Sequence, residues 1–277
     1  NPYETFRDWY TKDYQSFLDY NIQDVELVDR IDDKMKLIDL ILTMTYEAKV
    51  NMSDSFTSVK YWDILIYNHL LKNNIVIPQK PSTKNKSEKY VGAYVKEPQV
   101  GQHKWVLSFD LNSLYPHLIM QYNISPETLV DKTVDLGKNP IDDLVNKKTG
   151  LDSFKGTNYA LTPNGAMFRK DKQGFLAKMM QDMYDDRTIY KKKMLDAKQK
   201  YEDTKDPKYL KDISRFNNIQ MARKISLNSA YGAIGNEWFR YYELMIAEGI
   251  TTSGQLSIRW IERKLNEYIN NVLKTKD

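Results

Sequence analysis

The chain has 277 residues, of which 41% are hydrophobic, so it is long enough to bury the core of one large domain or two modest ones. Cysteine is absent, which excludes disulfides and thiolate metal sites and is typical of an intracellular protein, and no apolar run is long enough to predict a membrane span. The formal net charge of +4 is too small to indicate a nucleic-acid partner unless the basic residues cluster.

The first quarter of the chain has a helical pattern, from Trp9 to about Leu71. Apolar residues recur there every three or four positions between residues 25 and 42. Residues 76–103 are predicted to be strand and loop, because Pro78, Pro81 and Pro98 interrupt them.

Residues 104–176 are predicted to hold a buried strand, a helix and a loop-rich stretch. The strand would span residues 105–109, a short apolar run rich in aromatic and β-branched residues. Asp110 would end this strand, and Pro116 suits the first turn of the helix that follows. An acid at such a point can hold Mg²⁺ together with a backbone carbonyl and a bound phosphate. A simple helix cap is the alternative role for Asp110.

From Ala177 to the C-terminus the pattern is helical almost throughout. Pro207 interrupts the first long run and predicts an antiparallel helical hairpin with a charged tip near residues 191–211. On its first arm Arg187 and Lys191 are one turn apart, so they could reach the same phosphate. A solvated helix surface is the alternative explanation for these two cations.

A polar and aromatic face is predicted within residues 223–232. At helical spacing Lys224, Asn228 and Tyr231 share one side of the helix, and Gly232 follows them. This combination suits a nucleotide, because the ammonium can bind phosphate, the ring can contact sugar or base, and glycine permits close approach. An ordinary amphipathic helix is the alternative.

Together these two stretches resemble motifs A and B of the family B DNA polymerases. Asp110-Leu-Asn-Ser-Leu-Tyr-Pro116 is similar to motif A, and residues 224–232 are similar to motif B, in which Lys, three residues, Asn-Ser, one residue and Tyr-Gly follow one another. Residues 121–128, 162–165 and 232–242 are similar to the replicative polymerases of T-even-type tailed phages. His117 departs from the family, which commonly has Ser there, and it is expected to face away from the nucleotide without a catalytic role.

The resemblance implies an α+β fold with a partial palm of antiparallel β-strands, a long helical-hairpin fingers subdomain and an N-terminal helical segment. The implied divisions are residues 1–36 for the end of the exonuclease domain, 37–103 for a connecting segment and palm entry, 104–173 for the palm, 174–236 for the fingers, and 237–277 for a palm helix.

The resemblance also implies the function of a DNA-directed DNA polymerase, which adds deoxynucleotides to a primer 3′ end by two-metal phosphoryl transfer with Mg²⁺. The implied partners are primer-template DNA, a dNTP and, for the full-length protein, a sliding clamp. Asp110 and the Leu111 carbonyl would ligate metal, and Tyr115 would stack under the deoxyribose and exclude a 2′-hydroxyl. The implied phosphate contacts are the backbone amides of Asn112, Ser113 and Leu114 and the side chains of Arg187, Lys191 and Lys224. Asn228 would support the triphosphate site, and Tyr231 and Gly232 would line the minor-groove side of the nascent base pair.

Two shorter fragments extend the resemblance. Tyr20 and Asp24 are similar to the third exonuclease motif, in which Tyr orients the attacking water and Asp binds a metal; their spacing puts both on one helical face. Tyr90-Val-Gly-Ala93 resembles a segment that lies near the template strand, where Gly92 would allow close phosphate approach. A glycine bend in a β-hairpin is the alternative for Gly92.

The second acidic cluster of the family, Asp-Thr-Asp, does not occur in the sequence. The acid pairs at 142–143 and 185–186 are poor substitutes, because the first is predicted in a loop and the second on a solvated helix. We therefore expect a piece of a phage-type polymerase that is inactive or nearly so alone and needs the segment with the missing cluster. A split polymerase completed by another chain is one alternative, and a non-catalytic nucleic-acid-binding module is another. The expected location is intracellular, in the host cytoplasm if a phage encodes the protein.

Overall fold

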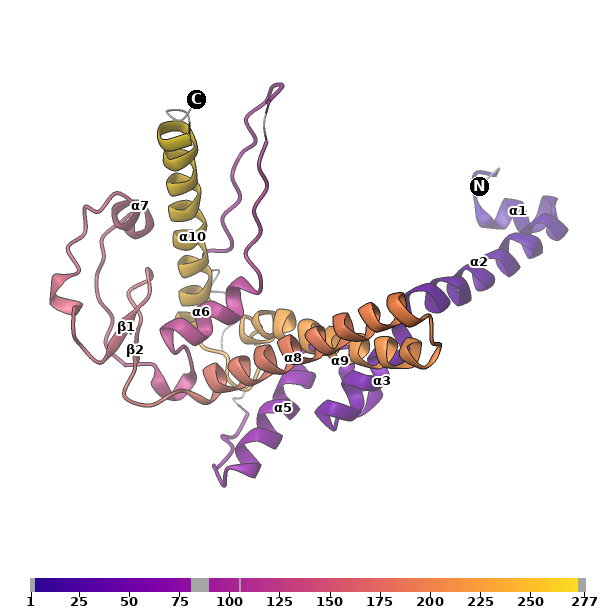
Figure 1. Cartoon of the computed structure of the whole chain (residues 1–277), viewed down its shortest axis with the longest axis horizontal. Helices are drawn as coiled ribbons and strands as arrows, with labels where there is room; N and C mark the ends of the chain where they lie inside the picture. The colour runs from indigo at the N-terminus through magenta and orange to yellow at the C-terminus, as the bar shows by residue number, and fades with distance from the viewer. Residues whose placement is uncertain (1–2, 81–89, 105, 274–277) are drawn as a thin grey trace.

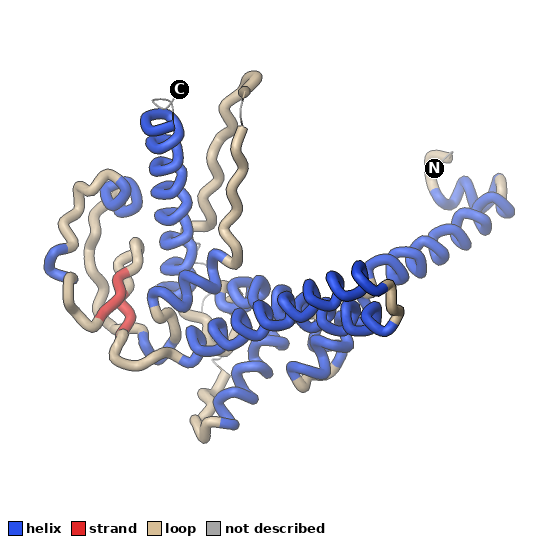
Figure 2. Tube along the Cα trace, in the orientation of Figure 1, coloured by secondary structure: helices blue, strands red, loops and turns tan. Residues whose placement is uncertain are grey.

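The computed structural model describes residues 3–80, 90–104 and 106–273, and it is mostly helical (Figures 1 and 2). The helices of the first quarter are α1 (Phe6–Lys12), α2 (Tyr14–Met35), α3 (Leu37–Ala48), α4 (Met52–Ser55) and α5 (Ser58–Lys72). Those that follow are α6 (Leu114–Tyr122), α7 (Pro140–Val145), α8 (Phe175–Thr204), α9 (Lys208–Ile234) and α10 (Leu244–Glu267). Single turns of 3₁₀-helix span Pro126–Thr128 and Asp152–Phe154, and a π-helical turn spans Tyr268–Val272.

The predicted α+β fold is confirmed only in part. The described residues contain one sheet, in which β1 (Tyr159–Leu161) and β2 (Met167–Arg169) pair antiparallel with Ala160 opposite Phe168. Gly165 makes the turn between these strands possible. Its φ is +85°, and a Cβ there would lie 2.2 Å from the Val134 carbonyl oxygen, so only glycine fits.

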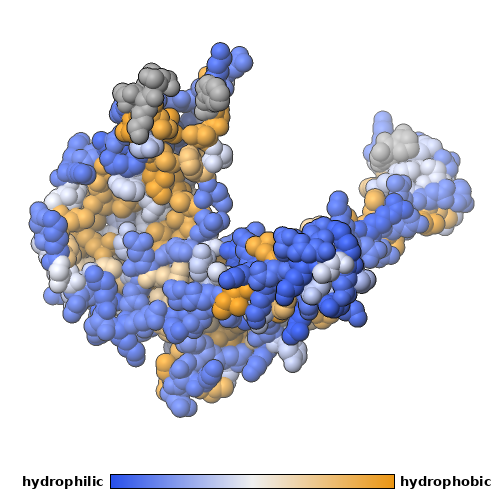
Figure 3. Space-filling view, viewed as in Figure 1, coloured by the Kyte–Doolittle hydropathy of each residue, from blue (hydrophilic) through white to orange (hydrophobic). Residues whose placement is uncertain are grey.

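The buried strand predicted at residues 105–109 is wrong for the residues that the structure describes there. Residues 106–109 have no secondary structure, and the side chains of Val106, Leu107 and Phe109 are 74%, 60% and 63% exposed; Trp105 lies outside the described residues. The physical reason is that β-propensity is expressed only on a paired, half-buried surface. No other described strand lies beside this segment, so its apolar side chains contribute to the hydrophobic surface near α10 in Figure 3.

The helical hairpin is confirmed: α8 and α9 lie side by side along their length (Figure 1). Lys205 ends α8 in the left-handed conformation, with φ 54°, and Pro207 immediately precedes α9. Proline fits that position because a first helical turn does not need its missing N–H.

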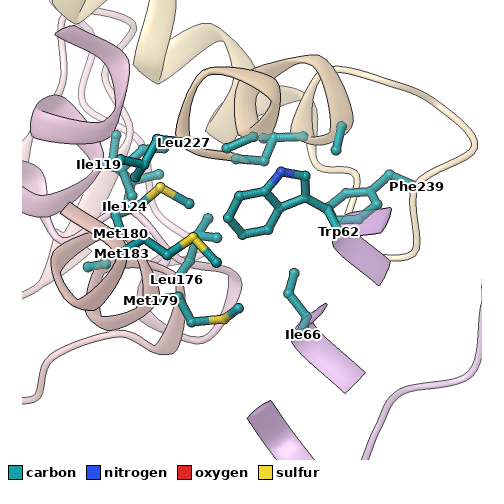
Figure 4. Packing of buried hydrophobic residues seen from close by; sticks show 14 of the residues in the cluster. Trp62, Ile66, Ile119, Ile124, Leu176, Met179, Met180, Met183, Leu227 and Phe239 are labelled. Carbon is teal, nitrogen blue, oxygen red and sulfur yellow. The ribbon is translucent and has the colours of Figure 1, made fainter. Parts of the chain in front are cut away.

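The main core lies where the base of this hairpin meets α5 and α6. In Figure 4 the indole of Trp62 packs beside Leu227, while Met179, Met180 and Met183 of α8 face the same interior. Burial of these side chains fixes α5 and α6 against the hairpin, since each fully buried large apolar residue contributes about 1.5–3 kcal/mol.

The N-terminus of α8 is tied to the end of α6 by polar side chains. Asn123, which follows α6 with φ 55°, donates from Nδ2 to the carbonyls of Arg169 and Lys172 and accepts from the Gly174 amide at Oδ1. The Ser125 hydroxyl accepts from the Leu176 amide at 3.3 Å. These bonds satisfy amides that a helix leaves open at its start, and they set the direction in which α8 leaves.

The helical pattern predicted for the first quarter is confirmed, and it is divided among α1 to α5. α2 projects away from the core in Figure 1 and buries none of its own side chains. Its apolar stripe, which includes Val25, Val28 and Ile31, is therefore exposed. In the described part of the chain, no helix has both the length and the hydropathy needed to cross a membrane.

Residues 90–94 lie along α10. The Thr251 hydroxyl donates to the Val91 carbonyl at 2.8 Å, and Gln255 Nε2 donates to the Gly92 carbonyl at 2.5 Å. One turn further, the Arg259 guanidinium stacks over the Tyr94 ring, 5.4 Å from its centroid. Residues 76–103 are predicted to be strand and loop; among them, the described residues 76–80 and 90–103 form loop without strand, and Pro81 lies outside the described residues.

Candidate functional site

The turn at residues 110–113 connects the exposed segment to α6. Asp110, Leu111 and Asn112 are exposed, and Ser113 is half-buried in the left-handed region, with φ 52° and ψ 47°. The Ser113 carbonyl accepts from the His117 backbone amide at 3.1 Å, which starts the helix. The turn thus presents a carboxylate and a short run of backbone groups to solvent at the N-terminal end of α6.

The first arm of the hairpin reaches this turn through Arg187. Arg187 Nη1 donates to the Ser113 hydroxyl at 3.3 Å, although the two residues are 74 positions apart. Lys191, one turn later on α8, is exposed. The sequence therefore placed both cations on one arm correctly, and the structure connects one of them to the predicted metal and phosphate turn.

The second arm reaches the start of α6 through an aromatic contact. The rings of Tyr115 and Tyr231 are 4.8 Å apart at 55°, and the Tyr231 hydroxyl donates to the Tyr90 hydroxyl at 3.0 Å. Burial raises the pKa of both Tyr115 and Tyr231, so these phenols stay neutral around pH 7. Three sequence-predicted residues, from three separate segments, thus meet beside the 110–113 turn.

The predicted face of α9 is exposed only in part. Lys224, Asn228 and Gly232 are exposed and Tyr231 is half-buried, whereas Ser226 and Leu227 are buried. A Cβ at Gly232 would have only Ser58 Oγ nearby, at 3.7 Å, so the space beside this backbone is open.

Sequence reasoning missed the side chains that hold this face in position. The Trp62 indole donates to the Ser226 carbonyl at 3.2 Å and to the Ser229 hydroxyl at 3.1 Å, and the Tyr61 and Ser226 hydroxyls bond at 2.7 Å. These residues are more than 160 positions apart. The sequence shows only the residue types: aromatic side chains with a polar atom on one helix and small hydroxyl side chains on another.

An ion triad also joins both arms to α3. Arg223 pairs with Glu47 at 3.1 Å and with Asp186 at 3.2 Å. Burial raises the pKa of Glu47, although Arg223 acts in the opposite direction. Asp186 and Arg223 directly precede Arg187 and Lys224, so the ion pair between the arms lies at the level of two predicted phosphate-binding cations.

The two shorter predicted fragments lie apart from each other. Tyr20 packs on Trp9, with ring centroids 4.9 Å apart, and Asp24 is exposed one turn later on α2. α2 extends away from α6 and α9 in Figure 1, so the structure does not bring this pair to Asp110. Gly92 is exposed, and a Cβ there would have nothing within 4 Å.

The described residues do not by themselves fit a two-metal centre. Their His, Asp and Glu side chains form no group of three that could hold a metal ion. Asp110 is a single exposed carboxylate. Asp142 is also no substitute, because it pairs with Arg259 of α10. A magnesium site at Asp110 would therefore need further acids from outside the described residues.

Comparison with known proteins agrees with the two sequence motifs. The family model for DNA polymerase family B matches residues 56–276. The DNA-directed DNA polymerase of Escherichia phage RB69 is 36% identical over 95% of this chain, and that of Enterobacteria phage T4 is 35% identical over the same share. The chain spans about a third of the length of these curated relatives, with 33% covered in each.

A solved structure shows the same fold at lower identity. The family B DNA polymerase of the hyperthermophilic archaeon Pyrobaculum calidifontis aligns with 86% of this chain and 27% of its own, at a TM-score of 0.58 and 22% identity. The motifs, the family model and the fold thus point to one family.

Proposed function

Because this chain belongs to DNA polymerase family B, we propose that it forms the nucleotide-binding part of a phage-type replicative polymerase, which adds deoxynucleotides to a primer 3′ end. The observation that carries the proposal is the meeting of the 110–113 turn and α6 with both arms of the hairpin. Arg187 joins α8 to Ser113, and Tyr231 joins α9 to Tyr115. The 110–113 turn, with its carboxylate and backbone amides, is thereby joined to one guanidinium and to a pair of aromatic rings from segments that are far apart in sequence.

The cations and the backbone amides would bind the triphosphate. Lys191 and Lys224 are exposed on their arms, and Arg187 lies at the turn itself. The amides of residues 112–114 would lie against the β- and γ-phosphates, as backbone nests hold other anions. Together these groups would offset the charge of the triphosphate and position the α-phosphate for in-line attack, with Asn228 supporting the site.

Tyr115 would select the sugar by steric exclusion. Its ring rests on Tyr231, and a Cβ at Gly254 of α10 would approach its Cε1 to 3.0 Å, so the ring is closely packed on that side too. A ring confined between two helices cannot easily make room for a 2′-hydroxyl. Tyr231 and Gly232 would line the minor-groove side of the nascent base pair.

The cofactor would be two Mg²⁺ ions, for which this chain supplies the Asp110 carboxylate and the Leu111 carbonyl. The remaining acids would come from a polymerase segment that carries Asp-Thr-Asp, because no such tripeptide occurs in these 277 residues. The chain alone is therefore inactive or nearly so in this proposal.

The remaining assignments follow from the same proposal. Residues 1–36 would end the exonuclease domain, with Tyr20 and Asp24 in its third motif, and residues 37–103 would connect it to the palm. Residues 104–173 and 237–277 would belong to the palm, and 174–236 to the fingers. Tyr90 and Gly92 would lie near the template strand, and primer-template DNA, a dNTP and a sliding clamp would be partners.

Primer extension tests the proposal. The chain is assayed alone and mixed with a segment that supplies Asp-Thr-Asp; we expect extension only in the mixture. Robust extension by the chain alone would contradict the incomplete metal site. Absence of extension in a mixture whose complex is demonstrated would favour a non-catalytic nucleic-acid-binding module instead.

Substitution of Tyr115 tests the sugar-selecting role in the same mixture. Tyr115→Ala should raise ribonucleotide incorporation relative to deoxynucleotide incorporation by about tenfold or more, since a pocket that has lost bulk no longer rejects a hydroxyl. Tyr115→Phe keeps the ring and is the matched control. Equal discrimination by the two variants would remove Tyr115 from this role.

A further inference from the structure

We propose that His117 is a positioning residue for nucleotide binding, which holds the backbone of Ser113 and docks α8 on the 110–113 turn so that Arg187 is kept beside the phosphate site. The inference rests on the proposed function. It gives His117 a positioning role and agrees with the expectation that His117 has no catalytic role, because its contacts are with Ser113 and Tyr184.

The first contact of His117 is with the turn itself. His117 Nδ1 lies 2.9 Å from the Ser113 carbonyl oxygen, which also accepts from the His117 backbone amide at 3.1 Å. A carbonyl oxygen can only accept, so Nδ1 carries the proton and donates. Ser113 has φ 52°, a conformation that residues other than glycine rarely adopt. The imidazole therefore supports the strained residue whose amide the proposed function places against a phosphate.

The second contact of His117 is with the hairpin. Its ring meets the Tyr184 ring of α8 edge to face, with centroids 4.6 Å apart and planes at 80°. Arg187 follows Tyr184 by three residues, so both lie on the same side of α8. Tyr184 meets His117 and Arg187 meets the Ser113 hydroxyl, which makes two contacts one helical turn apart.

This arrangement couples the turn to the arm through one side chain. The Ser113 carbonyl is held by His117 and the Ser113 hydroxyl by Arg187, while His117 also touches α8 directly. A serine at position 117 could bond the carbonyl four residues before it, but it is too short to reach Tyr184. Histidine provides both contacts, which gives a physical reason for a residue other than serine directly after motif A.

The test measures binding of Mg²⁺-dATP to the chain by titration calorimetry in a double-mutant cycle. His117→Phe keeps the ring but removes the hydrogen bond, so the dissociation constant should rise about fivefold, the ratio expected for one neutral hydrogen bond. If His117 acts through Arg187, the rise should fall below about twofold in an Arg187→Met background. It should persist at about fivefold in a Lys224→Met background, because Lys224 is on the other arm.

A second measurement does not require nucleotide. Hydrogen exchange of the peptide that covers residues 113–120 should be faster in His117→Phe, while the peptide around residue 224 is unchanged. His103→Phe is the matched control, because His103 also bonds a backbone carbonyl, that of Gln99, at 2.9 Å, but lies in an exposed loop.

The outcomes separate this inference from the proposed function. Unchanged exchange in His117→Phe, or an equal loss of affinity in both backgrounds, would overturn the positioning role. A chain that binds dATP through Lys224 but is indifferent to His117 would sink the inference alone. A chain whose exchange responds to His117→Phe but which does not bind dATP would contradict the proposed function instead.

Discussion

Replacing Asn123 with alanine should lower the free energy of unfolding by about 4 kcal/mol. Asn123 is only 8% exposed and joins the end of α6 to the start of α8. Its side chain makes three hydrogen bonds to backbone groups, at 2.6 Å to Arg169, 2.8 Å to Lys172 and 2.8 Å from Gly174.

The expected loss has two parts. Each hydrogen bond contributes about 1 kcal/mol net, which gives about 3 kcal/mol for the three. Asn123 also has φ 55°, and alanine in the left-handed region costs about 1 kcal/mol more. Asn123→Gly tolerates that region, so it should recover about 1 kcal/mol relative to alanine. Asn74→Ala is the matched control, because Asn74 has φ 54° but is exposed, and it should lose only about 1 kcal/mol.

Urea unfolding followed by far-ultraviolet circular dichroism measures these differences. Native chain, Asn123→Ala, Asn123→Gly and Asn74→Ala are compared at equal concentration, and equal slopes against urea justify comparing midpoints. The reasoning is refuted if Asn123→Ala loses no more than Asn74→Ala, because the three buried bonds would then contribute nothing measurable.

Two further perturbations test packing and charge, each with a matched variant. Gly165→Ala should lower the free energy of unfolding by at least about 2 kcal/mol, because a Cβ there would meet the Val134 carbonyl oxygen at 2.2 Å. Gly137→Ala is the matched variant: Gly137 has φ +84° and open space around it, so the loss should be about 1 kcal/mol. Similar melting temperatures for the two variants would contradict this. Arg223→Met should lower the free energy of unfolding by about 2 kcal/mol, since it leaves Glu47 and Asp186 without their cation. Glu47→Gln, which mimics the protonated acid that burial favours, should cost little or nothing at neutral pH. Burial raises the pKa of Glu47, so the stability that its protonation contributes is complete below pH 4.5 and is lost as pH rises through the raised pKa. Glu47→Gln should remove that part of the pH dependence of the free energy of unfolding. If stability depends on pH in the same way in this variant, Glu47 is not its source.

Local signals predicted the elements that carry the candidate site. Pro207 marked the tip of the hairpin, and the three- and four-residue spacing in α9 placed Lys224 and Asn228 on one exposed face. Such features depend on residues within a few turns of one another, so a single sequence contains the necessary information.

Contacts between distant segments could not be predicted in the same way. The hydrogen bonds of Trp62 to Ser226 and Ser229 cross more than 160 residues, and no periodicity records such a pairing. The error at residues 106–109 has a related cause: the residue types favour a strand, but a strand also needs a neighbour to pair with. Residue type reveals what a segment can form, whereas the rest of the fold decides whether it does.

Some glycines are required by packing within the chain, whereas Gly232 leaves open space beside its backbone. At Gly165 a Cβ would lie 2.2 Å from the Val134 carbonyl oxygen, a backbone atom, so the fold itself demands glycine there. At Gly235 the nearest atom is the Tyr90 hydroxyl, 2.4 Å away at the end of a side chain, which would have to shift.

Gly232 is different, because a Cβ there would come no closer than 3.7 Å to Ser58 Oγ. It lies within helix α9, where glycine destabilises the folded chain by about 0.5–1 kcal/mol relative to alanine. Gly232→Ala should therefore raise the free energy of unfolding by about that amount and yet weaken primer extension in the completed polymerase, as expected where a site trades stability for close approach of a ligand. Greater stability with undiminished extension would mean that the open backbone at Gly232 serves no bound nucleotide.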